Sequence, residues 1–434
     1  LRLCAYPAYM ATASSHLDTE IDLSGCDVPI SPKASGGRSR PGSGKSRQQN
    51  RPVNRVSSLK NISFDSPRPT GSTAHQTKQQ LKLGYSNVLM AALGCIRAFA
   101  EYAEGGVCDA ELLSKPEFLC KIALLAEENI HISLIPKLCY ASLSYYSYNK
   151  DNHAEFANPT LLKSLFIMTK SEDIVVREMI ATIFCNVSLT LESRVKMVQE
   201  GVMDILTVLS GATNQLLQEL CARCLCNLTV SKGLHAPLIS HGILHTLLMI
   251  ALVRSVSKLT KQLASRAMLN IISNPDNMDS VLEAGVIRAL GTLASVHDSH
   301  TQSICAKGFL IFSSTEKGRM DLGQRKNVLQ ALFGLVKGGK QNKVMVLVGR
   351  AVCNLLQDRQ TRFAAVNAGA LAILKIIATS GFDELRESTA RVIISLAGDV
   401  SLHPYLIKEP IVSVLVYILD DSDVWSLECV VRAF

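Results

Sequence analysis

The sequence predicts an all-α solenoid of about eight stacked repeats, preceded by a disordered tail. From about residue 81 onward, apolar residues recur at three- and four-residue spacing, and no segment alternates with the period of two typical of a sheet. One motif returns at intervals of 41 or 43 residues. The chain has 434 residues and only 5% aromatic residues, which favours many thin aliphatic layers over a single large core.

Residues 1–80 differ in composition from the rest of the chain. They are rich in Ser, Pro, Gly and Arg, and their eleven basic and five acidic residues supply a net +6 of the chain's +8. Such a segment buries too little apolar surface to offset its ordering entropy. We therefore expect a disordered basic tail over 1–80 and a solenoid over 81–434, with weak repeats over 85–171, clear repeats over 172–423 and a truncated repeat over 424–434.

The most regular motif of the repeat carries an Asn near its end. Its copies are REMIATIFCNVS (177–188), QELCARCLCNLT (218–229), KQLASRAMLNII (261–272), QSICAKGFLIFS (302–313), MVLVGRAVCNLL (345–356) and RESTARVIISLA (386–397). The Asn position holds Asn186, Asn227, Asn270, Ile311, Asn354 and Ser395, and we place Ser144 there in a weaker first copy. The residue five places earlier is always small, which lets neighbouring helices pack closely.

A Gly followed by an apolar run forms a second landmark, about 15 residues after the Asn. It occurs at Gly201, Gly242, Gly285 and Gly369, and Gln324 and Pro410 stand there in two weaker copies. Gly permits a sharp reversal between helices through a positive φ. A unit of about 42 residues cannot bury its own apolar faces, so stacked units must bury them together.

On these motifs the chain resembles armadillo-repeat proteins, since CARCLCNLT, SRAMLNI and GRAVCNLL are similar to that family's A-x-x-L-x-N-L pattern. HEAT repeats are the nearest alternative, but they lack the pairing of Gly and Asn. The resemblance implies three helices per repeat, a right-handed superhelix, and a concave groove of third helices that binds extended peptides. It also implies that Asn186, Asn227, Asn270 and Asn354 hydrogen-bond the backbone of a bound peptide.

The residue one helical turn before the Asn separates two branches of this family. The importin-α branch has Trp there, whereas this chain has Thr182 and then a run of cations, and its single Trp is Trp425. The resemblance is therefore to the β-catenin-like or vacuolar-armadillo-like branches.

Five consecutive repeats carry a cation one turn before the Asn position: Arg223, Arg266, Lys307, Arg350 and Arg391. Residues four apart on a helix share a face, so these side chains should line the groove with the Asn residues. Because Arg presents a forked donor to carboxylates and phosphates, we expect an extended acidic or phosphorylated partner. The alternative is that the cations pair with acids of adjacent repeats or are simply solvated.

No motif in the chain indicates catalysis, a cofactor or a metal. Gly44-Lys45-Ser46 resembles the end of a phosphate-binding loop but lacks the first Gly and the flanking strand and helix. Cys221, Cys224, His241 and His245 have zinc-like spacing, but we favour core packing for these cysteines. Sequons at Asn186-Val-Ser188 and Asn227-Leu-Thr229 coincide with the repeat Asn and are not interpreted as glycosylation sites.

The tail carries candidate phosphorylation sites. Ser31 and Ser66 precede Pro, and Ser58 lies three residues after Arg55; phosphates there would lower the positive charge of the tail. We favour a solvated linker, with weak contact to an anionic surface as the alternative, and no specific binding of nucleic acid.

These observations bound the location and the function. The longest apolar stretch, GILHTLLMIALV (242–253), is shorter than the roughly 20 residues of a membrane span, and the start lacks a secretory signal. Thirteen scattered Cys favour reduced thiols and a cytoplasmic protein, with nuclear or cytoskeletal association left open. We expect a non-catalytic scaffold or adaptor; the alternatives are a trafficking or nuclear-transport receptor and a cytoskeletal or flagellar assembly protein.

Overall fold

The computed structural model describes residues 93–94, 116–253, 255–338, 342–380, 382–408 and 411–420. Within these ranges the regular structure is helical throughout and contains no strand, which confirms the predicted all-α solenoid. The predicted tail with Ser31, Ser58 and Ser66, most of 85–115 and the truncated repeat over 424–434 lie outside the described residues.

Each repeat consists of a short first helix, a second helix and a longer third helix. The complete units are α5 (His153–Phe156), α6 (Pro159–Met168), α7 (Ile174–Val187); α8 (Leu191–Gln199), α9 (Val202–Ser210), α10 (Gln215–Thr229); α11 (His235–Ser240), α12 (Ile243–Leu252), α13 (Lys258–Ile272); α14 (Met278–Glu283), α15 (Val286–Ala294), α16 (Ser299–Ser314); α17 (Glu316–Gln324), α18 (Lys326–Gly338), α19 (Asn342–Gln357); and α20 (Arg362–Asn367), α21 (Ala370–Ala378), α22 (Asp383–Ala397). Partial units flank them: α3 (Pro116–Glu128) with α4 (Leu134–Tyr146), and α23 (His403–Lys408) with α24 (Ile411–Asp420).

Short 3-10 turns precede four of the first helices: η1 (Lys150–Asn152), η2 (Lys232–Leu234), η3 (Pro275–Asn277) and η4 (Val400–Leu402).

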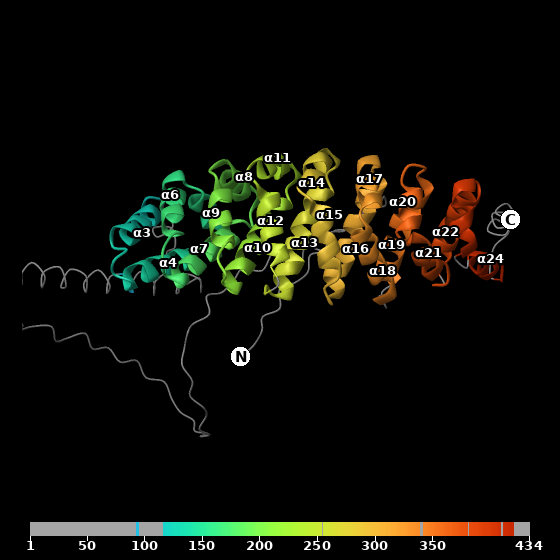
Figure 1. The fold of residues 1–434 in the computed structure, drawn as a ribbon. Coiled ribbons are helices and arrows are strands. Elements are labelled where there is room, and N and C mark those ends of the chain that lie inside the picture. Colours follow the sequence, from blue (N-terminus) through green and yellow to red (C-terminus); the bar gives the residue numbers. More distant parts are fainter. Residues whose placement is uncertain are drawn as a thin grey trace, which may run out of the picture.

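Helices of the same kind stack along the length of the molecule (Figure 1). The third helices form one continuous row, in which α4, α7, α10, α13, α16, α19 and α22 each contact the next. The second helices from α6 to α24 form a parallel row, and first helices such as α14, α17 and α20 form the edge between them. We call the row of third helices the third-helix face.

The turn between the first and second helices depends on Gly in four repeats. Gly201, Gly242, Gly285 and Gly369 have φ of 81°, 81°, 76° and 96°, a left-handed conformation that only Gly adopts without strain. This confirms the predicted chain reversal. In the repeat where we placed Gln324, Arg325 makes the turn instead with φ −102° and ψ 90°, and its guanidinium pairs with Asp321 at 2.8 Å.

Polar caps start the third helices at the spacing of the repeat. The side chains of Asp173, Asn214, Ser257 and Asp298 accept hydrogen bonds from backbone N–H groups in the first turns of α7, α10, α13 and α16. Each cap satisfies a donor that the helix itself leaves unpaired. The repeated sequence therefore specifies where each third helix begins, in addition to the position at which neighbouring helices pack closely.

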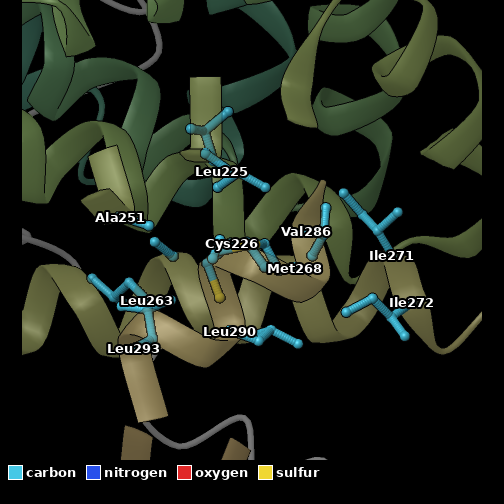
Figure 2. Packing of buried hydrophobic residues seen from close by; sticks show 14 of the residues in the cluster. Leu225, Cys226, Ala251, Leu263, Met268, Ile271, Ile272, Val286, Leu290 and Leu293 are labelled. Atoms are coloured by element: carbon cyan, nitrogen blue, oxygen red, sulfur yellow. The ribbon is translucent and has the colours of Figure 1, made fainter. Parts of the chain in front are cut away.

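The core is one continuous cluster of buried apolar residues that extends from Leu93 to Leu415 along the stacked repeats, and Figure 2 shows part of it. Leu225 of α10, Met268 of α13 and Leu290 of α15, which come from three successive repeats, are fully buried and belong to this cluster. Burial of each such side chain stabilises the fold by about 2 kcal/mol. A repeat therefore depends on its neighbours for stability.

Among the described residues, no single helix is long and apolar enough to cross a bilayer. The segments Lys232–Ser240 and Ile243–Leu252 reach that length and composition only as a pair, which bends by 84°.

Candidate functional site

The four repeat Asn residues join consecutive third helices. Each Asn Nδ2 donates to a hydroxyl of the preceding repeat: Asn186 to Ser147 (3.0 Å), Asn227 to Ser188 (2.9 Å), Asn270 to Thr229 (3.1 Å) and Asn354 to Ser313 (3.1 Å). Each hydroxyl in turn donates to the carbonyl three residues earlier on its own helix, at 2.7 or 2.8 Å. We call this series the Asn–hydroxyl ladder.

The ladder corrects the predicted register of the first copy. Ser188, two residues after Asn186, accepts the hydrogen bond from Asn227 of the next repeat. Ser147, two residues after Tyr145, accepts the equivalent hydrogen bond from Asn186. Tyr145, rather than Ser144, therefore occupies the Asn position of α4. The predicted position was one residue too early because neither Ser144 nor Tyr145 resembles the Asn of the other repeats.

The ladder leaves most of the Asn side chains buried. Asn186, Asn227 and Asn270 are 0%, 1% and 4% exposed, whereas Asn354 is half-buried. The Oδ1 atoms of Asn227 and Asn270 are buried and accept no hydrogen bond from the described residues. The amide nitrogens thus have a structural task in the interface between repeats, and the role of these residues in holding a peptide stays a prediction.

The cation row lies one turn before the Asn position on the third helices α10, α13, α16, α19 and α22. Its exposure changes along the molecule. Arg266 is only 8% exposed, and Arg223 is half-buried with Nη2 3.6 Å from Oε1 of Glu219. Lys307 is half-buried, whereas Arg350 and Arg391 are exposed. The solvent-accessible end of the row is therefore at α19 and α22.

A polar rail runs along the start of the third helices. Each N-cap residue contacts the residue eight places before the Asn position of the preceding repeat. Asp173 pairs with Lys137 (2.8 Å), Asn214 donates to Glu178 (3.0 Å), Ser257 donates to Glu219 (3.3 Å), and Gln262 donates to Asp298 (2.9 Å). These contacts use the polar groups of the face between α4 and α16, and they fix the spacing of the helices there.

The far end of the third helices is held by residues that sequence reasoning missed. Eight places after the Asn position, a His or Arg side chain contacts the carbonyl six residues before it: His153 to Ser147, Arg194 to Ser188, His235 to Thr229, Arg319 to Ser313 and His403 to Ala397. We call these, with Arg362 at the same position, the corner residues. They satisfy carbonyls that the helix end leaves open, and the Arg charges also complement the helix dipole.

The corner residue His235 is a neutral, buried ring. Asn277 Nδ2 lies 3.0 Å from Nδ1 and must donate to it, so Nε2 carries the proton that bonds the Thr229 carbonyl at 2.8 Å. Burial lowers the pKa of His235 below its ordinary value, and this outweighs the opposing effect of the Thr229 carbonyl. Protonation of His235 Nδ1 would place its N–H group opposite the N–H group of the Asn277 side chain, so that two donors would face each other.

The solenoid should lose stability as the pH falls below about 6.5, the ordinary pKa of His. The unfolded chain takes up protons there while the folded chain does not, so the loss grows until the lower folded pKa is reached. We expect His235→Asn to weaken this dependence of stability on pH. The Asn side chain keeps a donor for the Thr229 carbonyl, just as Asn277 donates to the Ile271 carbonyl. Urea unfolding at about pH 7.5 and about pH 5.5 checks it; an unchanged pH slope would contradict it.

The cysteine spacing that suggested zinc lies in the core. Cys221 and Cys224 are fully buried, Cys224 Sγ donates to the Phe184 carbonyl at 3.4 Å, and His241 is exposed. Burial raises the pKa of both thiols, so they stay protonated at neutral pH. In the part of the chain that the structure describes, no group of three His, Cys, Asp or Glu could hold a metal ion.

Solved structures share this architecture. The crystal structure of an engineered protein from the Northeast Structural Genomics Consortium has a TM-score of 0.50 and 19% identity, and the match covers 79% of this chain and 93% of that one. Computationally designed armadillo repeat proteins for modular peptide recognition have a TM-score of 0.47 and 15% identity, with 54% and 99% covered. A designed armadillo repeat protein in complex with the peptide (KR)4 has a TM-score of 0.42 and 16% identity, with 57% and 99% covered.

With stacked repeats of three helices and a left-handed Gly between the first and second, the fold is armadillo-like. The predicted three helices per repeat and the Gly between the first and second helix are both present in this armadillo-like solenoid. The preference for the β-catenin-like or vacuolar-armadillo-like branches over the importin-α branch stays a prediction. No family model matches the sequence, and no curated protein matches it either.

Proposed function

We propose that the protein is a non-catalytic scaffold that binds an extended acidic segment of a partner protein along the third-helix face, between α16 and α22. The observation that carries the proposal is the exposure of Arg350 and Arg391 at the same position of successive third helices. Equivalent positions of stacked helices share a face, so a single partner segment can reach both guanidinium groups. Their forked donors suit carboxylates.

The third-helix face differs between its two halves. From α4 to α13 its polar groups contact one another across repeats, as with Glu178 and Asn214 or Glu219 and Ser257. Toward α19 and α22 the cations Arg350 and Arg391 are exposed to solvent. An acidic ligand binds most favourably to cations that are already exposed, because a buried cation would first have to move out of its packed position. We therefore place the binding segment at the second half of the face.

Helix spacing sets the length of the partner segment. Packed helices lie about 8–10 Å apart and an extended chain advances about 3.3 Å per residue, so about three residues span one repeat. From Lys307 to Arg391 there are two repeat steps, and a segment of about six to nine residues covers them.

Reversing the exposed charges tests the proposal. We expect Arg350→Glu with Arg391→Glu to weaken binding of a labelled peptide of about twelve residues, alternating Glu and Ser, by about tenfold or more. Each exposed ion pair contributes up to about 1 kcal/mol, and the reversal adds repulsion. Fluorescence anisotropy measures the change.

The matched control is Lys337→Glu with Lys375→Glu, which changes the net charge equally at exposed positions of the second helices α18 and α21. Circular dichroism checks that both proteins are folded. If the two double variants bind the peptide equally well, the cation row is only solvated surface and the proposal is wrong.

A further inference from the structure

A cavity of about 1140 Å³ lies between the second helices α15 and α18, and the loop before α16 closes one side of it. We call it the α15–α18 trough. It belongs mainly to the second-helix row, so it is separate from the exposed cations of α19 and α22 on the third-helix face. Of the polar rail, the Asn–hydroxyl ladder and the corner residues, only Asp298 of the polar rail lines the trough.

Small residues create the trough. Gly291 and Ala294 on α15 and Ala331 and Gly334 on α18 all line it. In the preceding repeat, Leu248 of α12 stands at the position of Gly291, because Gly242 and Gly285 start the two second helices 43 residues apart. A Cβ added at Gly334 would meet no atom within 4 Å, so this side of α18 borders open space.

The charged lining of the trough is mostly basic. Arg288, Arg325 and Lys326 line it, and Arg325 already pairs with Asp321. Among the described residues, no carboxylate pairs with Arg288 or Lys326, and both are exposed. The trough therefore offers two cations that have room for a carboxylate from elsewhere.

One acidic residue, Asp298, also lines the trough, but its carboxylate is engaged. Its Oδ2 accepts from Thr301 N (2.8 Å), Thr301 Oγ1 (2.6 Å) and Gln262 Nε2 (2.9 Å). Burial alone would raise the pKa of Asp298, but these hydrogen bonds outweigh it and hold the pKa below its usual value. Asp298 thus remains a charged helix cap and does not neutralise Arg288 or Lys326 by direct contact.

Three exposed carboxamides supply the hydrogen-bond donors and acceptors that a peptide backbone requires. Gln324, Asn327 and Gln330 line the trough and are exposed, and a carboxamide both donates and accepts hydrogen bonds. The volume exceeds the roughly 300–1,000 Å³ of small-molecule pockets. From the size, the two cations and the carboxamides together, we infer that the α15–α18 trough is a second docking site, which binds an acidic, extended segment of a partner protein.

This inference does not depend on the proposed role of Arg350 and Arg391. The test therefore uses the full chain carrying Arg350→Glu and Arg391→Glu, in which the third-helix face is disabled. Residual binding of the labelled Glu- and Ser-containing peptide is then measured by fluorescence anisotropy at low salt. Arg288→Glu with Lys326→Glu should reduce this binding about tenfold, because both trough cations are reversed.

Two further variants separate charge from shape. Gly334→Leu fills the trough without changing any charge and should also weaken binding about tenfold, whereas Lys337→Glu on the same helix lies outside the trough and should not. Loss of binding in both trough variants with retention in Lys337→Glu supports the inference. Unchanged binding in either trough variant overturns it.

Competition with inorganic phosphate identifies the class of ligand. An unlabelled copy of the peptide is compared with millimolar phosphate as a competitor. If phosphate displaces the labelled peptide equally well, the trough is a site for small anions, and the inference that it binds a protein segment is overturned. If Arg350→Glu with Arg391→Glu leaves peptide binding unchanged while the trough variants abolish it, only the proposed function is contradicted, because the trough then carries the binding.

Discussion

Gly318→Ala should destabilise the solenoid by about 3 kcal/mol, since overpacking a site that cannot relax has costs of this order. Gly318 lies where α16 passes into α17 through the single residue Thr315, which ends one helix and caps the next. A Cβ at Gly318 would overlap the carbonyl oxygen of Phe312 and lie 2.6 Å from Thr315 Oγ1. Neither atom can move cheaply, because Phe312 is fully buried and Thr315 Oγ1 accepts the Gly318 N–H at 3.2 Å.

Gly334→Ala is the matched control for this substitution. Gly334 is an exposed helical residue whose added Cβ would meet no atom within 4 Å, so the higher helix propensity of Ala should stabilise α18 by up to about 1 kcal/mol. The two substitutions add the same methyl group to first and second helices of one repeat. Urea unfolding followed by circular dichroism compares them, and equal midpoints would show that the corner between α16 and α17 tolerates a side chain.

The sequence predicted features that recur at one position in several repeats. The positive φ at Gly201, Gly242, Gly285 and Gly369 follows from the residue type, and the third helices lie where the Asn motif placed them. The partners of the Asn residues were also visible. Ser188 and Thr229, noted only as parts of sequons, are the hydroxyls that bond the Asn of the next repeat.

The corner residues could have been found from the same repeat. Arg194 and His235 stand 41 residues apart, as do Asn186 and Asn227, but His and Arg differ too much to look like one motif. What they share is a donor that reaches a carbonyl at the end of a helix. That common role can be recognised only in the structure, where Arg194 contacts the Ser188 carbonyl and His235 contacts the Thr229 carbonyl.

Other features depend on how successive repeats pack and carry no local signal. Arg266 and Arg350 occupy the same motif position, yet the first is buried and the second is exposed. The α15–α18 trough similarly needs Gly291 and Gly334, which are distant in sequence, to line one space. A motif fixes the helix face on which a residue lies but not how closely the next repeat covers it.

Arg362→Leu should destabilise the C-terminal repeats by about 3 kcal/mol, because a buried charged donor is lost and its acceptors remain. Arg362 of α20 is 5% exposed and joins the ends of two third helices. Its Nη2 donates to the Gln357 carbonyl at the end of α19 (2.8 Å) and to Ser395 Oγ (3.0 Å). Its Nη1 donates to the Ser395 carbonyl of α22 (3.1 Å) and lies 3.7 Å from Asp399. Leu cannot donate a hydrogen bond to any of these acceptors.

Arg359→Leu serves as the control, because Arg359 is exposed three residues earlier and its replacement should change stability by less than about 0.5 kcal/mol. In a solenoid each repeat contacts only its neighbours, so the damage from Arg362→Leu should stay local. Native-state hydrogen exchange should show faster exchange of amides in α19 to α22, with those in α7 to α13 unchanged. Equal acceleration along the whole chain would mean that the repeats unfold as one unit, and no acceleration would mean that Arg362 does not hold the corner. A local loss would also reduce peptide binding without touching a binding residue, because Arg350 and Arg391 are carried by the two helices that Arg362 joins.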